Sequence, residues 1–260
     1  ALQGNADIAV GNAVGSVTAN VGLIMCVALI CMECAMTRKQ FGVKACLLLA
    51  AILALFGFTR DGQLSVLESV LILVIFVGFL VESLIAARQE QGSELPAQEE
   101  RPKIDKKTVL LNIGKFLLGA AGIVLGAQLL IDNGSALARM LGVPDAVIAA
   151  TMIAIGTSLP ELVTTLTAIK KKQASLSVGN IIGANIMDLT LIMPLCAVIQ
   201  GKPMTVERQG MLLDIPACLI ICAAALIPAL VQGKFKRWIG YLIGGLYIAY
   251  LIIMFTCFGA

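Results

Sequence analysis

The sequence predicts an all-α, polytopic membrane protein with eight transmembrane helices and an inverted internal repeat. First, 59% of its 260 residues are hydrophobic and only 13% are charged, whereas soluble domains carry about a quarter charged residues. Second, its apolar stretches approach the roughly 20 residues that a helix needs to cross a bilayer core. Third, part of the first apolar stretch recurs in the sixth. With a mean hydropathy of +0.95, the chain has too little polar surface for a water-soluble fold.

Eight apolar segments, bounded by charged or turn-forming residues, are the expected membrane spans. They are Ile8–Met36, Cys46–Phe58, Leu64–Ala87, Val109–Leu130, Ala146–Ile169, Leu176–Ile199, Met211–Val231 and Trp238–Phe258.

One hydrophilic stretch separates the third span from the fourth. It is rich in Glu, Gln, Arg and Lys and contains Pro96 and Pro102, a composition typical of a linker. We therefore expect an N-terminal half at residues 1–87 with three helices, a cytoplasmic linker at 88–107, and a C-terminal half at 108–260 with five helices.

The distribution of Lys and Arg predicts the orientation, because these residues accumulate on the cytoplasmic side of a membrane. Alternating spans place 14 of them on one side and four on the other. The first set is Arg38, Lys39, Lys44, Arg88, Arg101, Lys103, Lys106, Lys107, Lys170, Lys171, Lys172, Lys234, Lys236 and Arg237, and the second is Arg60, Arg139, Lys202 and Arg208. Both ends of the chain are thus expected outside and the linker inside.

An internal repeat relates the first and sixth spans. Residues 11–25 read GNAVGSVTANVGLIM and residues 179–193 read GNIIGANIMDLTLIM, with six identical positions. Because the first and sixth spans cross in opposite directions, this is an inverted repeat, and in transporters such repeats place the substrate site near the midplane, at the interface between them. A GxxxG spacing alone also occurs at ordinary helix contacts, but the match here is longer.

The repeats carry matching polar stripes. Asn12, Ser16 and Asn20 recur every four residues, so they share one face of a helix. In the sixth span, Asn180, Ala184 and Asp188 occupy the same three places. A single Asn or Ser commonly bonds a neighbouring helix, whereas two matching stripes, one of which ends in a carboxylate, favour a binding site.

The fifth span contains the sequence Gly156-Thr157-Ser158-Leu159-Pro160-Glu161. Pro160 has no N–H group, so the carbonyl four residues earlier loses its helical donor and the helix is expected to break. An ordinary proline kink is the alternative. Glu161 argues against it, because an acid at this depth costs about 2.5–3.5 kcal/mol and indicates a site for a cation or a proton.

The residue types also restrict the ligand. Carbonyl, hydroxyl, amide and carboxylate oxygens suit Na⁺, Ca²⁺ or Mg²⁺, whereas zinc and copper favour imidazole and thiolate, and the sequence has no histidine. The eight cysteines fall mostly in apolar runs, so we interpret them, including the Cys31 and Cys34 pair, as packing residues. We expect the carboxylates of Glu161 and Asp188 and the amide of Asn20 to converge on one midplane cavity.

The segment GTSLPELVTTLTAIKKKQASLSVGNIIGANIMDLTLI (156–192) resembles the second α-repeat of the sodium/calcium exchangers, in the cation/calcium exchanger superfamily. GNADIAVGNAVGSVTANVGLI (4–24) resembles the latter part of the first α-repeat. The resemblance extends over essentially the whole chain. It implies a ten-helix fold, of which eight helices are present here and the first two, with their own GTSxPE-like segment, are expected to be missing. The chain would then be a truncated, proteolysed or partial form. The short linker indicates a prokaryotic-type exchanger.

The resemblance also implies the ion ligands. Glu161 corresponds to one of two central calcium-binding glutamates, and the other expected ligands are Thr157, Ser158, the carbonyl of Ala154, Ser16, Asn20 and Asp188. Ala184 stands where the first repeat has Ser16, so one hydroxyl ligand is absent on that side.

The function implied is exchange of Ca²⁺ for Na⁺ across the plasma (cell inner) membrane by alternating access, with no cofactor and with the two ions and the lipid bilayer as partners. Related proton/calcium exchangers usually have a GNAxE-like sequence in place of residues 156–161, which favours sodium. Proton/calcium exchange, or exchange of another cation, and an inactive fragment stay open as alternatives. An enzyme is not expected, because no nucleophile–base pair or HExxH spacing occurs.

Overall fold

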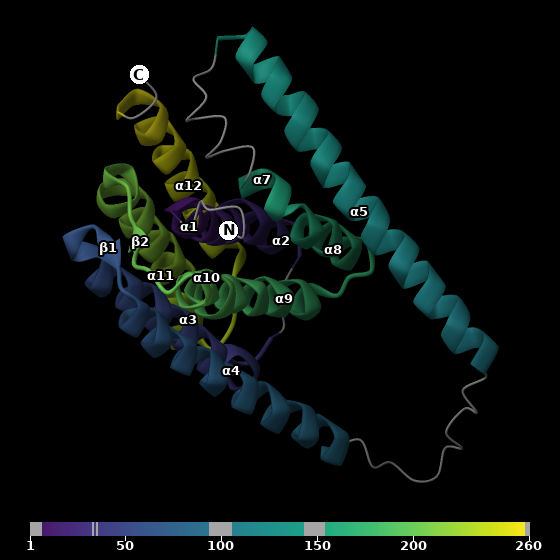
Figure 1. Cartoon of the computed structure of the whole chain (residues 1–260). Helices are drawn as coiled ribbons and strands as arrows, with labels where there is room; N and C mark the ends of the chain where they lie inside the picture. Colours follow the sequence, from purple (N-terminus) through teal and green to yellow (C-terminus); the bar gives the residue numbers. More distant parts are fainter. Residues whose placement is uncertain (1–6, 33, 35, 94–105, 143–153, 258–260) are drawn as a thin grey trace.

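The computed structural model describes residues 7–32, 34, 36–93, 106–142 and 154–257, and almost all of them are helical (Figure 1). The first half contains α1 (Asp7–Ala19), the π-helical η1 (Asn20–Met25), α2 (Cys26–Cys31), α3 (Arg38–Phe58), the 3-10 turn η2 (Thr59–Asp61), the strand β1 (Gln63–Leu64) and α4 (Val66–Ser93). The second half contains α5 (Lys106–Met140), α7 (Ala154–Thr157), α8 (Leu159–Lys170), α9 (Ala174–Met187), the π-helical η4 (Asp188–Ile192), α10 (Met193–Gln200), the strand β2 (Met204–Thr205), the π-helical η5 (Gly210–Asp214), α11 (Ile215–Gln232) and α12 (Arg237–Cys257).

Seven helical segments of the described residues are long and apolar enough to cross a membrane. They are Ala9–Cys31, Arg38–Asp61, Val66–Arg88, Lys107–Met140, Ala174–Gln200, Gly210–Gln232 and Arg237–Cys257. The remaining predicted span, the fifth, is the broken pair α7 and α8, and its residues before Ala154 lie outside the described part of the chain. The predicted all-α polytopic class is therefore confirmed.

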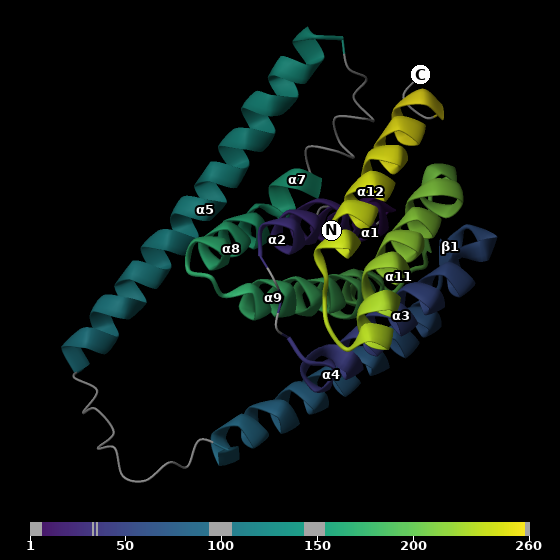
Figure 2. The same cartoon turned by 180° about the vertical axis from the view of Figure 1, so that it is seen from behind.

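Three helices extend well beyond their predicted limits, and one span is shorter than predicted. α3 begins at Arg38 instead of Cys46, and the first span ends at Cys31 instead of Met36. The fourth span was expected to stop at Leu130, but α5 continues to Met140 and is about 50 Å long at 1.5 Å per residue. α4 continues to Ser93, so the first residues of the predicted linker are helical. In Figures 1 and 2, α5 lies at the edge of the helical assembly, on the side of α7 and α8, and it contacts both of them.

Capping residues fix the starts of α3 and α4. The Gln40 side chain accepts a hydrogen bond from the Thr37 backbone N–H at 2.9 Å, and Glu68 accepts one from the Ser65 backbone N–H at 2.8 Å. These are capping boxes, in which a side chain three residues into the helix satisfies a free N–H at its start. Glu68 therefore acts locally, at the end of its span.

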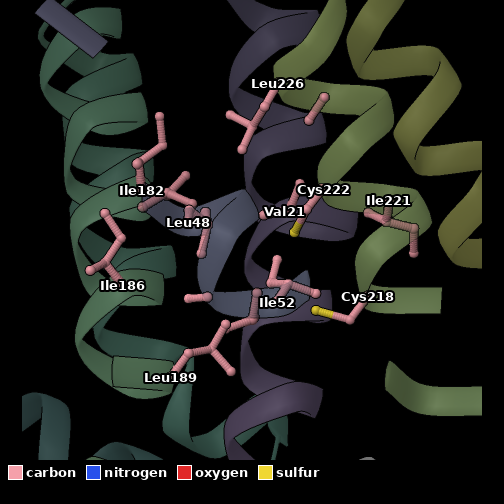
Figure 3. Packing of buried hydrophobic residues seen from close by; sticks show 14 of the residues in the cluster. Val21, Leu48, Ile52, Ile182, Ile186, Leu189, Cys218, Ile221, Cys222 and Leu226 are labelled. Carbon is pink, nitrogen blue, oxygen red and sulfur yellow. The ribbon is translucent and has the colours of Figure 1, made fainter. Parts of the chain in front are cut away.

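The core lies between the helices that contain the repeats and the helices that follow them. In Figure 3, side chains of α9 and η4 face α3, while side chains of η1 and α11 close the other side. The labelled residues are Val21, Leu48, Ile52, Ile182, Ile186, Leu189, Cys218, Ile221, Cys222 and Leu226. All are fully buried, so the two halves share one apolar core.

The contacts between helices follow the two-fold relation that the repeat predicts. α12 packs against η1 and α2, and α4 packs against η4 and α10. Likewise, α11 contacts α1 and α3 contacts α9, while α3 and α11 contact each other. Each half thus covers the repeat helix of the other in a reciprocal way.

Both repeat helices also change geometry at the same place. η1 begins at Asn20 and η4 begins at Asp188, which are matched positions of the repeat. In η4, the Met193 N–H bonds the Asp188 carbonyl five residues earlier, which is the π-helical pattern. Short π segments frequently occur at functional sites, because they redirect side chains within a helix. The local geometry therefore singles out Asn20 and Asp188.

Two backbone pairings join loops of the first half to loops of the second. β1 pairs with β2 in an antiparallel register, Gln63 with Thr205 and Leu64 with Met204, and Cys34 forms an isolated bridge with Phe235. The first pairing lies at ends of spans that the predicted alternation places on one side of the membrane, and the second lies at ends that it places on the other. This agreement supports the predicted alternation of the spans.

Candidate ion-binding site

A break in the fifth span lies at the centre of the candidate site. α7 ends at Thr157, Ser158 forms a turn, and α8 starts at Leu159 with Pro160 in its first turn. Proline fits there because the first N–H groups of a helix have no intrahelical acceptor. The break confirms the prediction from the Gly156–Glu161 sequence. It also places Glu161 in the first turn of α8, where the positive end of the helix dipole favours a carboxylate.

One side chain of the first repeat reaches this break directly. Ser16 Oγ and Thr157 Oγ1 are 2.7 Å apart and share a hydrogen bond. Ser16 is buried in α1, which contacts α7. Two predicted ligands that are 141 positions apart in the sequence thus lie side by side.

A second contact joins the repeats at Asn20. The Asn20 amide Nδ2 donates a hydrogen bond to Oδ1 of Asn185 at 2.9 Å, and both residues are fully buried. Asn185 was not among the predicted site residues. The sequence does contain one signal for it, since Asn185 is a lone amide among the apolar residues of 181–187. Aligning the two repeats does not reveal Asn185, however, because its matched residue in the first repeat is the apolar Val17.

Two carboxylates of the predicted site lie on different elements. Glu161 is in the first turn of α8 and Asp188 begins η4, and both are half-buried. Like charges at a buried site are unfavourable unless a cation compensates them. The elements around them are also in contact, α8 with η1 and α1 with η4. Convergence of Glu161, Asp188 and Asn20 on a single cavity stays a prediction.

Several buried oxygens at this interface have no hydrogen-bond partner among the described residues. They are Asn12 Oδ1, Asn20 Oδ1, Ser158 Oγ and Glu161 Oε2. Leaving a buried polar atom unpaired costs about 1–3 kcal/mol. All four are hard oxygen donors on α1, η1 or the α7–α8 break, so they fit a hydrated or bound Na⁺ or Ca²⁺ ion. Asn12, which begins the first polar stripe, joins the predicted set.

The remaining predicted positions are less informative. Ala154 is described only as the first residue of α7. Asn180, which begins the second stripe, is exposed and donates from Nδ2 to Thr164 Oγ1 at 3.2 Å, so it joins α9 to α8. Asp188 is thus the residue of the second stripe that stays a predicted ligand.

Two other acids of the spans have partners of their own. Glu82 lies 3.6 Å from the ammonium group of Lys44. Asp214, in η5, accepts hydrogen bonds from the Tyr250 hydroxyl at 3.1 Å and from the Gln209 amide at 3.4 Å. Glu82 Oε2 makes no hydrogen bond within the described part of the chain, but the nearby ammonium group of Lys44 compensates its charge.

Comparison with known proteins identifies the family of the chain. The family described as sodium/calcium exchanger protein matches residues 1–85 and 111–256. The chain is 35% identical to the sodium/calcium exchanger MaX1 of Methanosarcina acetivorans over 144 residues, which are 55% of this chain and 41% of that protein. It is 28% identical to the inner membrane protein YrbG of Escherichia coli K12 over 98% of this chain and 79% of that protein.

A solved structure has the same fold. The sodium-calcium exchanger NCX_Mj, soaked with Na⁺ and Sr²⁺, superposes with a TM-score of 0.74 and 26% sequence identity. The match covers 95% of this chain and 76% of that one. Together with the family match over most of the sequence, this shows that the chain belongs to the sodium/calcium exchanger protein family.

Proposed function

We propose that this protein is a secondary active antiporter that exchanges Ca²⁺ for Na⁺ by alternating access. The observation that supports this most is the group of buried oxygens on α1, η1 and the α7–α8 break that lack a partner among the described residues, together with the half-buried carboxylates of Glu161 and Asp188. Neutral hydroxyl and amide oxygens can bind either ion, whereas the paired carboxylates favour the divalent one. Competition for shared oxygens would couple the two ions without a covalent step.

Each ligand has a proposed role. Glu161 and Asp188 compensate the charge of the cation, and Asn20, Ser158 and the Ala154 carbonyl supply neutral oxygens. Ser16 and Thr157, which are hydrogen-bonded to each other, lie where the two repeats meet. A change in the relative position of the repeats would therefore change the ligand set and the side from which it is reached.

We also propose the cell inner membrane as the location, with the linker cytoplasmic. YrbG, a similar protein, is described as an inner membrane protein. The excess of Lys and Arg on one set of loops supports this orientation.

Proton/calcium exchange is the second candidate, because a carboxylate such as Glu161 or Asp188 can also bind and release a proton in each cycle. Uptake of radiolabelled calcium into proteoliposomes separates the two. We expect an outward sodium gradient to drive uptake, and a matched potassium gradient or a proton gradient to drive none. Uptake driven by the proton gradient alone would instead establish the second candidate, and no uptake under any gradient would contradict both.

A further inference from the structure

We infer that Asn185 is a positioning residue, which turns the Asn20 amide so that its oxygen, and not its nitrogen, faces the transported cation. This inference rests on the proposed function. The observation behind it is a single buried hydrogen bond, 2.9 Å from Asn20 Nδ2 to Asn185 Oδ1, which joins the π segment η1 to α9.

An asparagine amide has two different ends. Its carbonyl oxygen can coordinate a cation, whereas its NH₂ group is a donor that a cation repels. In the structure, Asn20 uses the NH₂ group to bond Asn185, and its Oδ1 has no partner among the described residues. Turning the Asn20 amide by 180° would direct the donor at the cation. The acceptor on Asn185 opposes that rotation, because the buried NH₂ group would lose its partner.

The matched positions of the repeat explain why Asn20 needs an orienting residue and Asp188 does not. Asp188 occupies the place of Asn20, and Val17 occupies the place of Asn185. The contact of α9 with η1 has its counterpart in the contact of α1 with η4. A carboxylate has two equivalent oxygens, and either of them can coordinate a cation. Asp188 therefore requires no acceptor to orient it. The amide is thus paired with an acceptor, and the carboxylate with an apolar residue.

A packing role for Asn185 does not account for these facts. Val17, which is also fully buried, shows that an apolar side chain fits the matched place. Moreover, Asn185 Nδ2 is buried without a partner in the described part of the chain, which is unfavourable for a residue that serves packing alone.

A double-mutant cycle in the intact protein tests this positioning role. The variants are Asn185→Val, Asn20→Asp and the two combined, and equilibrium binding of calcium to the purified protein is measured alongside the KM and maximal rate of sodium-driven calcium uptake. We expect Asn185→Val to weaken calcium binding about tenfold, equivalent to about 1.4 kcal/mol, with a smaller change in maximal rate. In the Asn20→Asp background, where position 20 has two equivalent oxygens, the same change should weaken binding by less than about twofold.

Each outcome of the cycle either supports or overturns the positioning role of Asn185. An equal loss in both backgrounds, or no loss when Asn20 is present, would overturn the positioning role, whatever the transport result. Wild-type protein that binds calcium but shows no sodium-driven uptake would contradict the proposed exchange, while the cycle in binding still decides the role of Asn185. Wild-type protein that binds no calcium would overturn both.

Discussion

Replacing Glu161 with glutamine is expected to reduce sodium-driven calcium exchange to about 1% or less of the wild-type rate. Glutamine preserves the shape of the side chain but removes one negative charge beside a divalent ion. Two unit charges 4 Å apart attract by about 4 kcal/mol at an effective dielectric constant of 20, and even half of that value is more than a tenfold change in affinity. The α7–α8 break offers only neutral dipoles in compensation. Calcium uptake into proteoliposomes measures the effect.

Two further variants make this result specific. Asp188→Asn should be milder than Glu161→Gln, because the matched residue of the first repeat is already an amide, Asn20. Leu159→Ile, two residues before Glu161 and without an oxygen ligand, should leave ion selectivity nearly unchanged. Wild-type calcium transport by Glu161→Gln would remove this glutamate from the mechanism.

Replacing Gly22 with alanine is expected to destabilise the fold more than the same change at Gly11, Gly179 or Gly183. A Cβ atom at Gly22 would lie 2.7 Å from Cβ and 2.8 Å from Cγ of Tyr247 in α12. Because Tyr247 Cβ is fixed to the backbone, a change of rotamer cannot move it away, and α12 would have to shift from η1. Overpacking of this kind typically costs about 1–3 kcal/mol. Thermal unfolding of the detergent-solubilised protein should show a melting temperature several degrees lower.

Gly245→Ala is the matched control, since it lies in α12 two residues before Tyr247 and a Cβ atom there meets no other atom within 4 Å. This variant should be as stable as the wild type or slightly more stable, because alanine favours a helix over glycine. Equal melting temperatures for Gly22→Ala and the wild type would show that α12 does not rest on η1 at this point.

Hydropathy predicted the membrane spans well because their lengths are set by the bilayer. The fourth helix continues past the predicted span end at Leu130, because Asp132, Asn133 and Arg139 lower the local hydropathy without breaking the helix. The strands β1 and β2 have two residues each, too few for a period to be recognised.

For the site, the sequence predicted the helix break, because proline acts locally and its effect does not depend on distant residues. It also identified Ser16 and Thr157, which the fold brings into contact. It missed Asn185, whose partner is 165 positions away, and it gave no sign of the π segments at Asn20 and Asp188. Those features depend on how helices from different halves pack against each other. The pattern of polar and apolar residues along one helix does not specify that packing.

The loop pairings bear on how the protein matures in the cell. β1 emerges from the ribosome long before β2, and Cys34 long before Phe235. At the usual rate of synthesis, about 5–20 residues per second, β1 waits on the order of ten seconds for its partner. During that time its backbone groups stay open to wrong partners at the membrane surface. Both loop pairings can then form within a short interval, once the segment from β2 to the start of α12 has been synthesised. This late segment therefore supplies the second partner of the pairing on each side of the bilayer.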